Sequence, residues 1–403
     1  MPRWVLFLIF FSVSVLILGS VHFYFYRRLF VAPVLPPPWP KVGAVALIVA
    51  TLSFPISFFV VRTLEIGPAK LVVFPVYVWL GVMMMLFFTL LGIDVVRGAI
   101  WLGSRIAGQD SPLADPGRRQ LIARLLAGAA AGTVLTASGV ALGRGLGRLA
   151  MKRVDVLLRN LPPELDGFTI AQLTDLHLGA MRHGSWVDEV VRETNRLHPD
   201  LIAITGDLAD ATPQQLAREV AALGRLEAKH GVYFVTGNHE YFIDLPGWLH
   251  ALRSIGIRVL RNERVAIGRG DAEFDLAGVD DHQGARMAPG HGPDVAKAMR
   301  GADGARASVL LAHQPRVIFE AAEHRIGLVL SGHTHGGQIW PWRYLVYLQQ
   351  PYVSGLHEHE GTQIYVSEGT GFWGPPMRLG STAEISLVTL RSPGRAGSDA
   401  PDA

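Results

Sequence analysis

Four long apolar runs in the first 150 residues constrain most strongly what this chain can fold into. They cover residues 4–26, 42–61, 71–91 and 121–142, and charged residues concentrate in the gaps between them. A run of about 20 apolar residues is long enough to cross the hydrocarbon core of a bilayer. We therefore predict a transmembrane region over residues 1–150 with four spans, rather than four buried helices of a soluble protein.

The individual spans differ in texture. The first is too long for the apolar part of a signal peptide and has no convincing small-residue cleavage site. The Pro-rich stretch at residues 33–40 follows it and is predicted not to be helical. The fourth span is rich in Ala and Gly, which is typical of helices that pack closely within a membrane. We expect a multi-pass protein whose first partner is the lipid bilayer.

The charges leave the orientation of these spans open. Eight basic residues flank one face of the bundle and seven flank the other, so the positive-inside rule does not decide. Residues 117–122 (Gly-Arg-Arg-Gln-Leu-Ile) resemble a twin-arginine export signal, with Gly where Ser is usual. That interpretation favours the cell inner membrane and an extracytoplasmic location for the part of the chain that follows. A pair of arginines anchored at the headgroups explains the same residues equally well.

The remaining composition excludes several classes of protein. The chain of 403 residues has no cysteine, which excludes disulfides and thiolate metal sites. Its net charge is only +3 and its basic residues are scattered, so no nucleic acid is expected as a partner. From residue 151 the texture becomes that of a soluble domain, which we predict to extend to residue 391. The polar tail at residues 392–403 is predicted to be disordered.

Short apolar runs alternate with helical patterns in this second region. The predicted strands lie at residues 168–173, 200–205, 231–236, 274–279, 308–312 and 326–330. Helices are predicted at residues 186–197 and 214–228. Such alternation indicates βαβ units and a largely parallel sheet. The last two strands, at residues 363–366 and 385–390, are expected to be antiparallel.

Polar side chains collect where these predicted strands end. They are Asp175, His177, Asp207, Asn238, His239, His313, His333 and His335. Any one of them has a structural explanation, such as a helix cap for Asp175 or a satisfied loop histidine for His313. The carboxyl ends of parallel strands, however, meet at one edge of a sheet. A set that supplies only oxygen and imidazole atoms at one edge therefore predicts a metal site.

The densest motif of this set is Gly-His-Thr-His-Gly at residues 332–336. Two histidines separated by one residue point the same way if the backbone stays extended. The flanking glycines allow close approach to another group. Because neutral imidazole is the commonest metal ligand, the pair suggests a metal even before the other residues are considered.

Taken in order, five blocks resemble the calcineurin-like metallophosphoesterase family. They are Asp-x-His at 175–177, Gly-Asp at 206–207, Gly-Asn-His-Glu at 237–240, His313, and Gly-His-x-His at 332–335. The resemblance covers about residues 161–390. It implies a four-layer α/β/β/α sandwich that holds two divalent metal ions. A nitrogen and oxygen shell without sulfur fits Mn, Fe or Zn, and Mg less well.

The resemblance also implies a role for each matched position. The first ion would be bound by Asp175, His177 and His335. The second would be bound by Asn238, His313 and His333. Asp207 would bridge the two ions, and His239 would stabilise the transition state or protonate the leaving oxygen without binding metal. For Glu240 it implies no ligand role, and a place at the surface or around the ligands is expected.

The expected function is hydrolysis of a phosphoester or pyrophosphate. Residues 339–348 and 372–376 are dense in aromatic side chains, which indicates either an interface-seeking surface or the packing of small C-terminal strands. In the first case the substrate would be a phospholipid or a lipid-linked pyrophosphate. The alternatives are a tethered phosphodiesterase for soluble nucleotides and a membrane sensor with a structural metal site. A second His-x-His, His357 and His359, is expected in a solvated loop.

Overall fold

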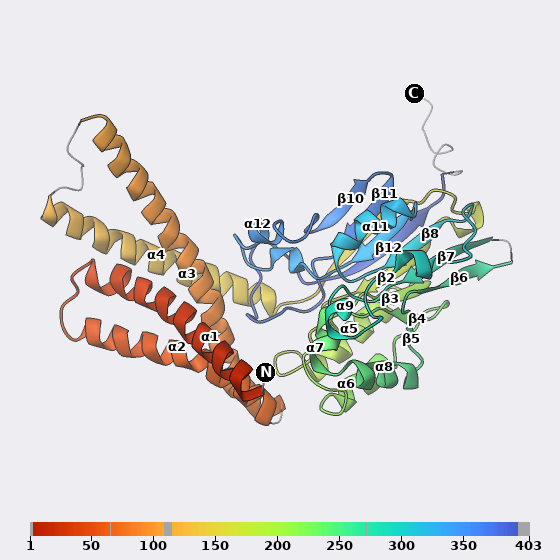
Figure 1. The fold of residues 1–403 in the computed structure, drawn as a ribbon, viewed down its shortest axis with the longest axis horizontal. Helices are drawn as coiled ribbons and strands as arrows, with labels where there is room; N and C mark the ends of the chain where they lie inside the picture. The colour runs from red at the N-terminus through yellow and green to blue at the C-terminus, as the bar shows by residue number, and fades with distance from the viewer. Residues whose placement is uncertain (1–2, 65, 109–114, 271, 394–403) are drawn as a thin grey trace. The chain divides into compact units, whose positions relative to one another are not determined.

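The computed structural model describes residues 3–64, 66–108, 115–270 and 272–393 of the chain. These fall into two compact units. The first comprises Met1–Gly143 with Gly374–Met377, and the second comprises Arg144–Trp373 with Arg378–Ala403. Figure 1 shows the helical first unit and the mixed α/β second unit. We describe each by itself.

Four helices of the first unit are long and apolar enough to cross a membrane, as predicted. They are α1 (Arg3–Tyr26), α2 (Trp39–Thr63), α3 (Ile66–Ile106) and α4 (Pro116–Gly145), with a π-helical turn η1 (Arg27–Val31) after α1. Each is longer than its predicted span. At 41 residues, α3 is roughly 60 Å long, about twice the thickness of a hydrocarbon core. The predicted apolar span at residues 71–91 is therefore only part of this longer helix.

The Pro-rich stretch differs slightly from its prediction. Trp39 and Pro40 belong to the first turn of α2, so only residues 33–38 are non-helical. A proline is tolerated there because the first turn of a helix has no internal partner for its N–H groups.

A buried histidine links three of the helices. Trp79 in α3 donates its Nε1–H to Nε2 of His22 in α1, at 2.9 Å. His22 Nε2 is therefore an acceptor, and Nδ1 carries the proton and donates to the Leu18 carbonyl at 2.8 Å. The Thr51 hydroxyl in α2 lies 3.0 Å from the same Nδ1. Polar contacts between helices hold membrane bundles together.

Two six-stranded sheets form the second unit. In spatial order, the first sheet contains β1 (Ala150–Leu157), β12 (Glu384–Arg391), β2 (Phe168–Leu173), β3 (Leu201–Ile204), β4 (Val232–Phe234) and β5 (Arg258–Val259). The second contains β10 (Gly355–His359), β11 (Thr362–Val366), β9 (Leu328–Ser331), β8 (Ser308–Leu311), β7 (Ala272–Gly278) and β6 (Glu263–Arg269). Strands β2 to β5 are parallel, as are β7, β8, β9 and β11.

Apolar side chains from both sheets form one core between them. Ile170 and Leu201 of the first sheet share this core with Val309 and Leu330 of the second. A second apolar cluster joins the outer face of the second sheet to α11 (Ile318–Glu323), through residues such as Leu310 and Ile318. This arrangement of two facing sheets confirms the predicted sandwich.

Short helices cover the sheets and complete the layers. Near the first sheet lie α5 (Ser185–Asn195), α6 (Ala217–Leu223), α7 (Asn238–Ile243) and α8 (Leu245–Ser254) (Figure 1). The others are α9 (Gly284–Met287), α10 (Val295–Ala298), α12 (Arg343–Val346) and the 3-10 turns η2 (Pro163–Leu165), η3 (Pro315–Val317) and η4 (His335–Gly337).

Three expectations about the second unit need correction. The helix predicted at residues 214–228 is only α6, because Asn195 binds the Arg225 carbonyl and the Glu227 N–H beyond its end. The terminal strands are not simply antiparallel, since β11 pairs parallel with β9 and β12 pairs parallel with β1. His357 and His359 lie in strand β10 rather than in a loop.

The predicted disordered tail lies mostly outside the described residues, which end at residue 393. Its first residue is held in place. The Ser392 N–H donates to Asp166 Oδ1 at 2.8 Å, and its hydroxyl donates to the Leu161 carbonyl at 2.8 Å.

Candidate metal centre

The predicted site residues follow the carboxyl ends of five parallel strands. Asp175 and His177 follow β2, Asp207 follows β3, and Asn238 and His239 begin α7 after β4. In the second sheet, His313 follows β8, and His333 and His335 follow β9. The structure brings these residues together at one edge of the sandwich.

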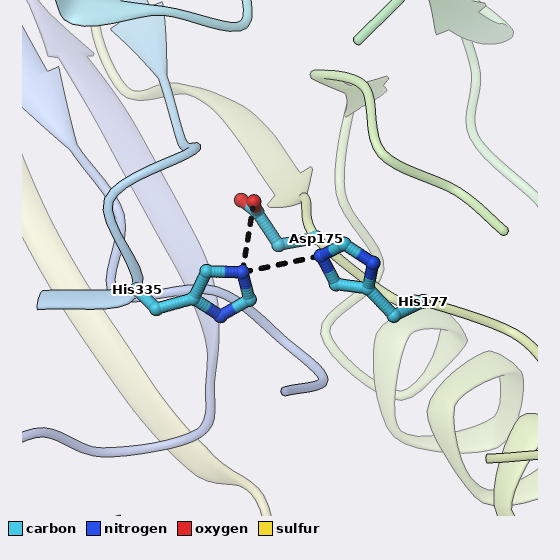
Figure 2. Close-up of side chains that lie close together, drawn as sticks. All are labelled: Asp175, His177 and His335. Atoms are coloured by element: carbon cyan, nitrogen blue, oxygen red, sulfur yellow. Dashed lines mark hydrogen bonds and ion pairs between the residues drawn. The ribbon is translucent and has the colours of Figure 1, made fainter. Parts of the chain in front are cut away.

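Asp175, His177 and His335 form a first ligand group (Figure 2). His335 Nε2 lies 3.3 Å from Asp175 Oδ1 and 3.2 Å from His177 Nε2. Asp175 and His177 reach this point from β2 of the first sheet, and His335 reaches it from β9 of the second. All three residues are buried. Three such atoms around one point make a shell for a single cation.

Asp207, His313 and His333 form a second ligand group. His313 Nε2 lies 3.2 Å from Asp207 Oδ2 and 3.2 Å from His333 Nδ1. Asp207 Oδ2 also lies 3.8 Å from His177 Nε2 in the first group. The Asp207 carboxylate therefore stands between the two groups, within reach of both.

Hydrogen bonds on the far side of two imidazoles aim the opposite nitrogen at the site. His313 Nδ1 donates to the Thr205 carbonyl at 2.9 Å, which leaves Nε2 free to bind a cation. His177 Nδ1 lies 3.0 Å from Asp210 Oδ1, so its Nε2 likewise faces the ligand group. Such outer contacts are the usual way in which metal-binding histidines are oriented.

One buried atom shows that the polar groups at this edge are not fully satisfied from within. Asn238 is 8% exposed, and its Oδ1 has no hydrogen-bond partner among the residues that the structure describes. An unpaired buried acceptor costs free energy unless something binds it. An amide oxygen is a ligand for hard divalent cations, so the residues present fit the two ions that the motifs imply.

The backbone of this edge is strained. Five of the seven predicted ligands have positive φ, between 48° and 70°: Asp175, His177, Asp207, His333 and His335. Residues other than glycine rarely adopt this conformation, and each instance costs of order 1–3 kcal/mol. The surrounding sandwich must therefore impose it. Strain concentrated at one polar edge is typical of a functional site.

This strain determines how the Gly-His-x-His motif presents its two histidines. The backbone of the motif is not extended, because His333 and His335 have φ values of 70° and 51°. The two histidines consequently enter different ligand groups instead of pointing the same way. Gly332 allows the close approach that was expected, since a Cβ there would overlap the Asp175 carboxylate and the Thr174 hydroxyl.

Burial and charge set the protonation of the ligands. Burial lowers the pKa of His333 to about 3 and holds the pKa of His335 well below its usual value. Burial alone would raise the pKa of Asp207, but the neighbouring His313 and His239 hold it well below its usual range. Neutral imidazoles and an ionised carboxylate are the states that bind a cation. Burial lowers the pKa of His313, but Asp207 more than offsets this and holds it well above its usual value, so His313 would release a proton when a cation binds.

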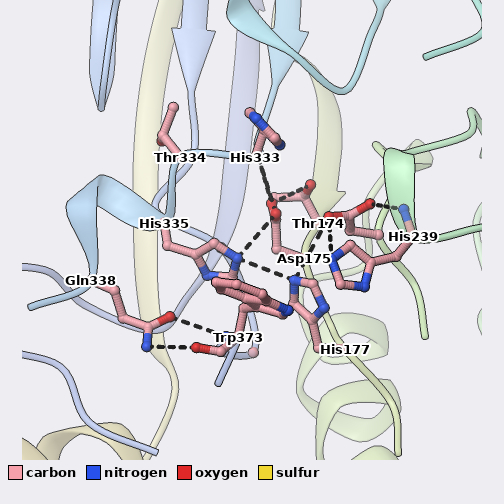
Figure 3. Close-up of polar contacts among 12 residues, drawn as sticks. Thr174, Asp175, His177, His239, His333, Thr334, His335, Gln338 and Trp373 are labelled. Atoms are coloured by element: carbon pink, nitrogen blue, oxygen red, sulfur yellow. Dashed lines mark hydrogen bonds and ion pairs between the residues drawn. The ribbon is translucent and has the colours of Figure 1, made fainter. Parts of the chain in front are cut away.

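His239 lies beside the ligand groups but is oriented differently (Figure 3). Its Nδ1 lies 2.6 Å from Asp210 Oδ1, and its backbone N–H donates to Asp207 Oδ1 at 2.9 Å. Its Nε2 is 3.9 Å from Asp207 Oδ2. Burial lowers the pKa of His239, but the Asp207 and Asp210 carboxylates more than offset this and raise it to about 9. A protonated His239 is a proton donor at neutral pH.

Sequence reasoning missed Asp210. This carboxylate contacts both His177 and His239, and the three residues form a third group of potential ligand atoms. We assign it to orienting the two rings, because each contact uses Nδ1 and leaves Nε2 directed at the site. Its signal in the sequence is the spacing of Gly-Asp-x-x-Asp at residues 206–210.

Glu240 lies around the ligands and not at the surface. It is fully buried and accepts hydrogen bonds from the N–H groups of Gly237 at 2.6 Å, Leu208 at 2.7 Å and Asp207 at 3.2 Å. It thereby ties the loop after β3 to the loop after β4. Burial and the neighbouring Asp207 raise the pKa of Glu240 to about 7.

Arg378 also escaped the sequence analysis and has no local signal there. It is fully buried, and its guanidinium donates to the carbonyls of Gly371 at 2.6 Å, Gly369 at 3.2 Å and Thr382 at 3.0 Å. It shapes the loop that packs against Asp175. By contrast, His357 and His359 join none of the ligand groups, since they contact the Ser354 carbonyl and the Phe319 ring.

Comparison with known proteins agrees with this geometry. Residues 168–337 match the calcineurin-like phosphoesterase family. The chain is 40% identical over 247 residues to a transmembrane protein with metallophosphoesterase domain from Danio rerio, covering 59% of this chain and 56% of that protein. The Bos taurus protein of the same name is 42% identical over 254 residues, which cover 60% of this chain and 57% of that protein. The chain thus spans little more than half the length of these relatives.

A third relative is covered more fully. An uncharacterized metallophosphoesterase from Aquifex aeolicus is 37% identical over 228 residues, which are 56% of this chain and 85% of that protein. The fold and the ligand groups define a metal-dependent phosphoesterase domain. The chain belongs to the metallophosphoesterase family, and its four apolar helices and its transmembrane relatives make it a membrane protein.

Proposed function

We propose that this protein is a membrane-bound phosphoesterase that uses two divalent ions to hydrolyse a phosphoester or pyrophosphate. The observation that carries the proposal is the position of Asp207. Its Oδ2 lies 3.8 Å from His177 in the first ligand group and 3.2 Å from His313 in the second. A carboxylate between two ligand groups is the arrangement expected of a dinuclear centre.

Each ligand has a role in the proposal. Asp175, His177 and His335 would hold one ion, Asn238, His313 and His333 the other, and Asp207 both. Mn, Fe, Zn and Mg are all compatible with these nitrogen and oxygen atoms. When bound, two such cations lower the pKa of the attacking water and offset the charge of the phosphoryl oxygens.

The proton for the leaving oxygen would come from His239. Asp210 holds Nδ1 of this ring at 2.6 Å, so the opposite nitrogen, Nε2, is the one presented to substrate. Because the pKa of His239 is raised to about 9, the ring carries a proton at neutral pH. General acid catalysis of this kind typically contributes a factor of about 10²–10⁴.

The substrate in this proposal is a phospholipid or a lipid-linked pyrophosphate. Supporting it, two large exposed side chains flank the proposed acid: the Trp373 ring lies 6.1 Å and the Phe242 ring 5.6 Å from the His239 ring. Such a border offers apolar contact area to a lipid chain. A soluble nucleotide is the second candidate.

We also propose that the protein lies in the cell inner membrane with its catalytic domain extracytoplasmic.

The test uses purified full-length protein in detergent, loaded with Mn²⁺ and assayed on bis-p-nitrophenyl phosphate. Asp207→Ala should lower turnover by more than about a hundredfold, beyond the range typical of outer contacts. Metal analysis should find two ions per parent chain and fewer in the variant. The matched control is Asp303→Ala, an exposed carboxylate that only accepts a local hydrogen bond from Ala305. Equal turnover in Asp207→Ala and Asp303→Ala would refute the proposal.

A further inference from the structure

Large aromatic and apolar side chains are exposed together on a surface beside the candidate metal centre. Six large side chains expose between 45% and 80% of their area: Trp340, Trp342, Tyr344, Tyr347, Leu348 and Trp373. We refer to these six as the aromatic collar. Such a concentration on the surface of one domain marks an interaction site.

The collar is not part of the core. In the segment from residue 339 to 348, only Ile339 is buried, at 2% exposure. The segment has no acidic residue, and its one charge, Arg343, is turned inward. Arg343 donates to the Gly336 carbonyl at 3.2 Å and to Glu368 Oε1 at 3.2 Å. What remains outward is Trp, Tyr and Leu.

The collar is attached directly to the metal loop. It follows η4, which contains the ligand His335, and Ile339 forms a bridge with Leu379. Gln338 joins its two parts, because its side chain accepts from the Trp373 N–H at 3.0 Å and donates to the Trp373 carbonyl at 3.0 Å (Figure 3). The collar therefore borders the site that would hold the substrate.

The chain enters the catalytic domain at this same edge. Ala150, the first residue of β1, pairs with Glu384, the first residue of β12. Because β12 runs antiparallel to β2, with Ser386 opposite Gln172, its start lies at the carboxyl end of β2. That end carries Asp175. The polypeptide leaving the last apolar helix thus reaches the domain on its metal-centre side.

The connection is short and fastened. Only four residues separate Gly145, the end of α4, from Ala150, so the two lie at most about 18 Å apart. Arg182 donates to the Gly145 carbonyl, and its guanidinium lies 4.5 Å from the rings of both Trp186 and Phe372. Arg182 belongs to the loop that follows the ligand His177. The catalytic domain is therefore joined to α4 through its metal edge.

We propose that the aromatic collar docks the catalytic domain onto the lipid bilayer. Trp and Tyr prefer the depth of the lipid headgroups, where an apolar ring and a polar edge are both accommodated. The collar has this composition, carries no negative charge, and lies on the edge through which the chain from the last apolar helix enters the domain. The inference rests on the proposed function and adds to it: substrate would pass from the bilayer to His239 along Trp373 without crossing bulk water.

The experiment exploits the absence of cysteine from the chain. Full-length Leu348→Cys protein carries a nitroxide label at position 348, in nanodiscs of phosphatidylcholine and phosphatidylglycerol. Ala266→Cys supplies the control label, on the exposed side of β6. The β6–β7 hairpin lies at the opposite end of the domain from α12 (Figure 1). The accessibility of each label to dissolved oxygen and to a water-soluble nickel chelate is then measured.

The readout is the ratio of relaxation by oxygen to relaxation by the nickel chelate at each label. Docking predicts that this ratio is at least about tenfold higher at position 348 than at position 266. In a chain that also carries Trp340→Ser and Trp342→Ser, the two labels should show nearly equal accessibility ratios. Equal accessibility of 348 and 266 in the parent overturns the proposal. Protection of 348 only in discs that hold two copies assigns the surface to a contact between copies, which also overturns it.

This result is separable from the catalytic proposal, because accessibility does not depend on turnover. Bis-p-nitrophenyl phosphate hydrolysis is measured in the same discs with Mn²⁺. Turnover with a solvent-exposed label at 348 rejects docking alone. A lipid-buried label in a protein without turnover supports docking and rejects the proposed function.

Discussion

Each unit of this protein contains a buried polar cluster, and the two clusters differ in how far their hydrogen bonds are satisfied. In the helical unit, His22 is satisfied on both ring nitrogens, by Trp79 on one side and by Leu18 and Thr51 on the other. At the candidate metal edge of the catalytic unit, Asn238 Oδ1 has no hydrogen-bond partner among the described residues, and five predicted ligands have a strained backbone. A satisfied network holds helices together, whereas an unsatisfied, strained one is ready for ligands that come from outside.

Removing metal should break this comparison most completely. Chelation of the loaded protein should abolish turnover and leave the helical unit unaffected, because only the catalytic unit depends on cations. Each ion present at about 100 times its Kd stabilises by about 2.7 kcal/mol, so two ions contribute about 5 kcal/mol, which is roughly 10–20 °C in Tm for a domain of this size. Calorimetry with and without chelator measures the shift. A chelator-dependent shift of equal size in Asp207→Ala would contradict the assignment.

Filling the space at Gly332 should have the next largest effect. Gly332→Ala places a Cβ onto the Asp175 carboxylate and the Thr174 hydroxyl, so the first ligand group must move. A displacement of about 1 Å in such a site costs about a hundredfold in turnover, with about 1–3 kcal/mol of stability. The matched control is Gly304→Ala, whose Cβ meets open space. Metal content and kcat are compared, and parent-like values in both variants would rule out this packing role.

Replacing Asp210 should separate orientation from metal binding. Asp210→Asn is expected to lower kcat by about 10–100-fold while most of the metal is retained, because the carboxylate acts through His177 and His239. Burial lowers the pKa of His239, and Asp207 and Asp210 raise it. Loss of one carboxylate lowers that pKa, so the protonated acid disappears at lower pH. The basic limb of the pH–rate profile should shift to lower pH, and an unmoved limb would exclude Asp210 as the partner of His239.

The smallest effect is expected in the satisfied network. Trp79→Phe keeps the ring but removes the donor to His22 Nε2, which should cost about 0.6–2 kcal/mol of bundle stability. Thermal unfolding of the helical unit in detergent measures the loss. Turnover on a soluble phosphodiester should stay within twofold of the parent. A large fall in turnover would show that catalysis depends on the packing of the helical unit.

Much of this organisation was predictable because its signals are local. The apolar runs identified four helices, although α3 proved twice as long as a bilayer requires. The ligands follow strand ends, and the strands were visible as short apolar runs. The misjudged elements lacked such signals: β10 has alternating exposure at the edge of its sheet, and α6 ends where Asn195 reaches it from another helix.

The sequence by itself determined four long apolar helices, a largely parallel sheet of short strands and a set of candidate nitrogen and oxygen ligands at the strand ends, because hydropathy, periodicity and motif order are properties of neighbouring residues. Only the tertiary structure decided the backbone conformation that carries these residues and the contacts that orient them. Positive φ at His333 and His335 sends neighbouring histidines into separate groups, and strand register brings Asp210 to two rings and the chain entry to the metal edge. Backbone conformation and register arise from contacts between segments far apart in the chain, which no local pattern contains.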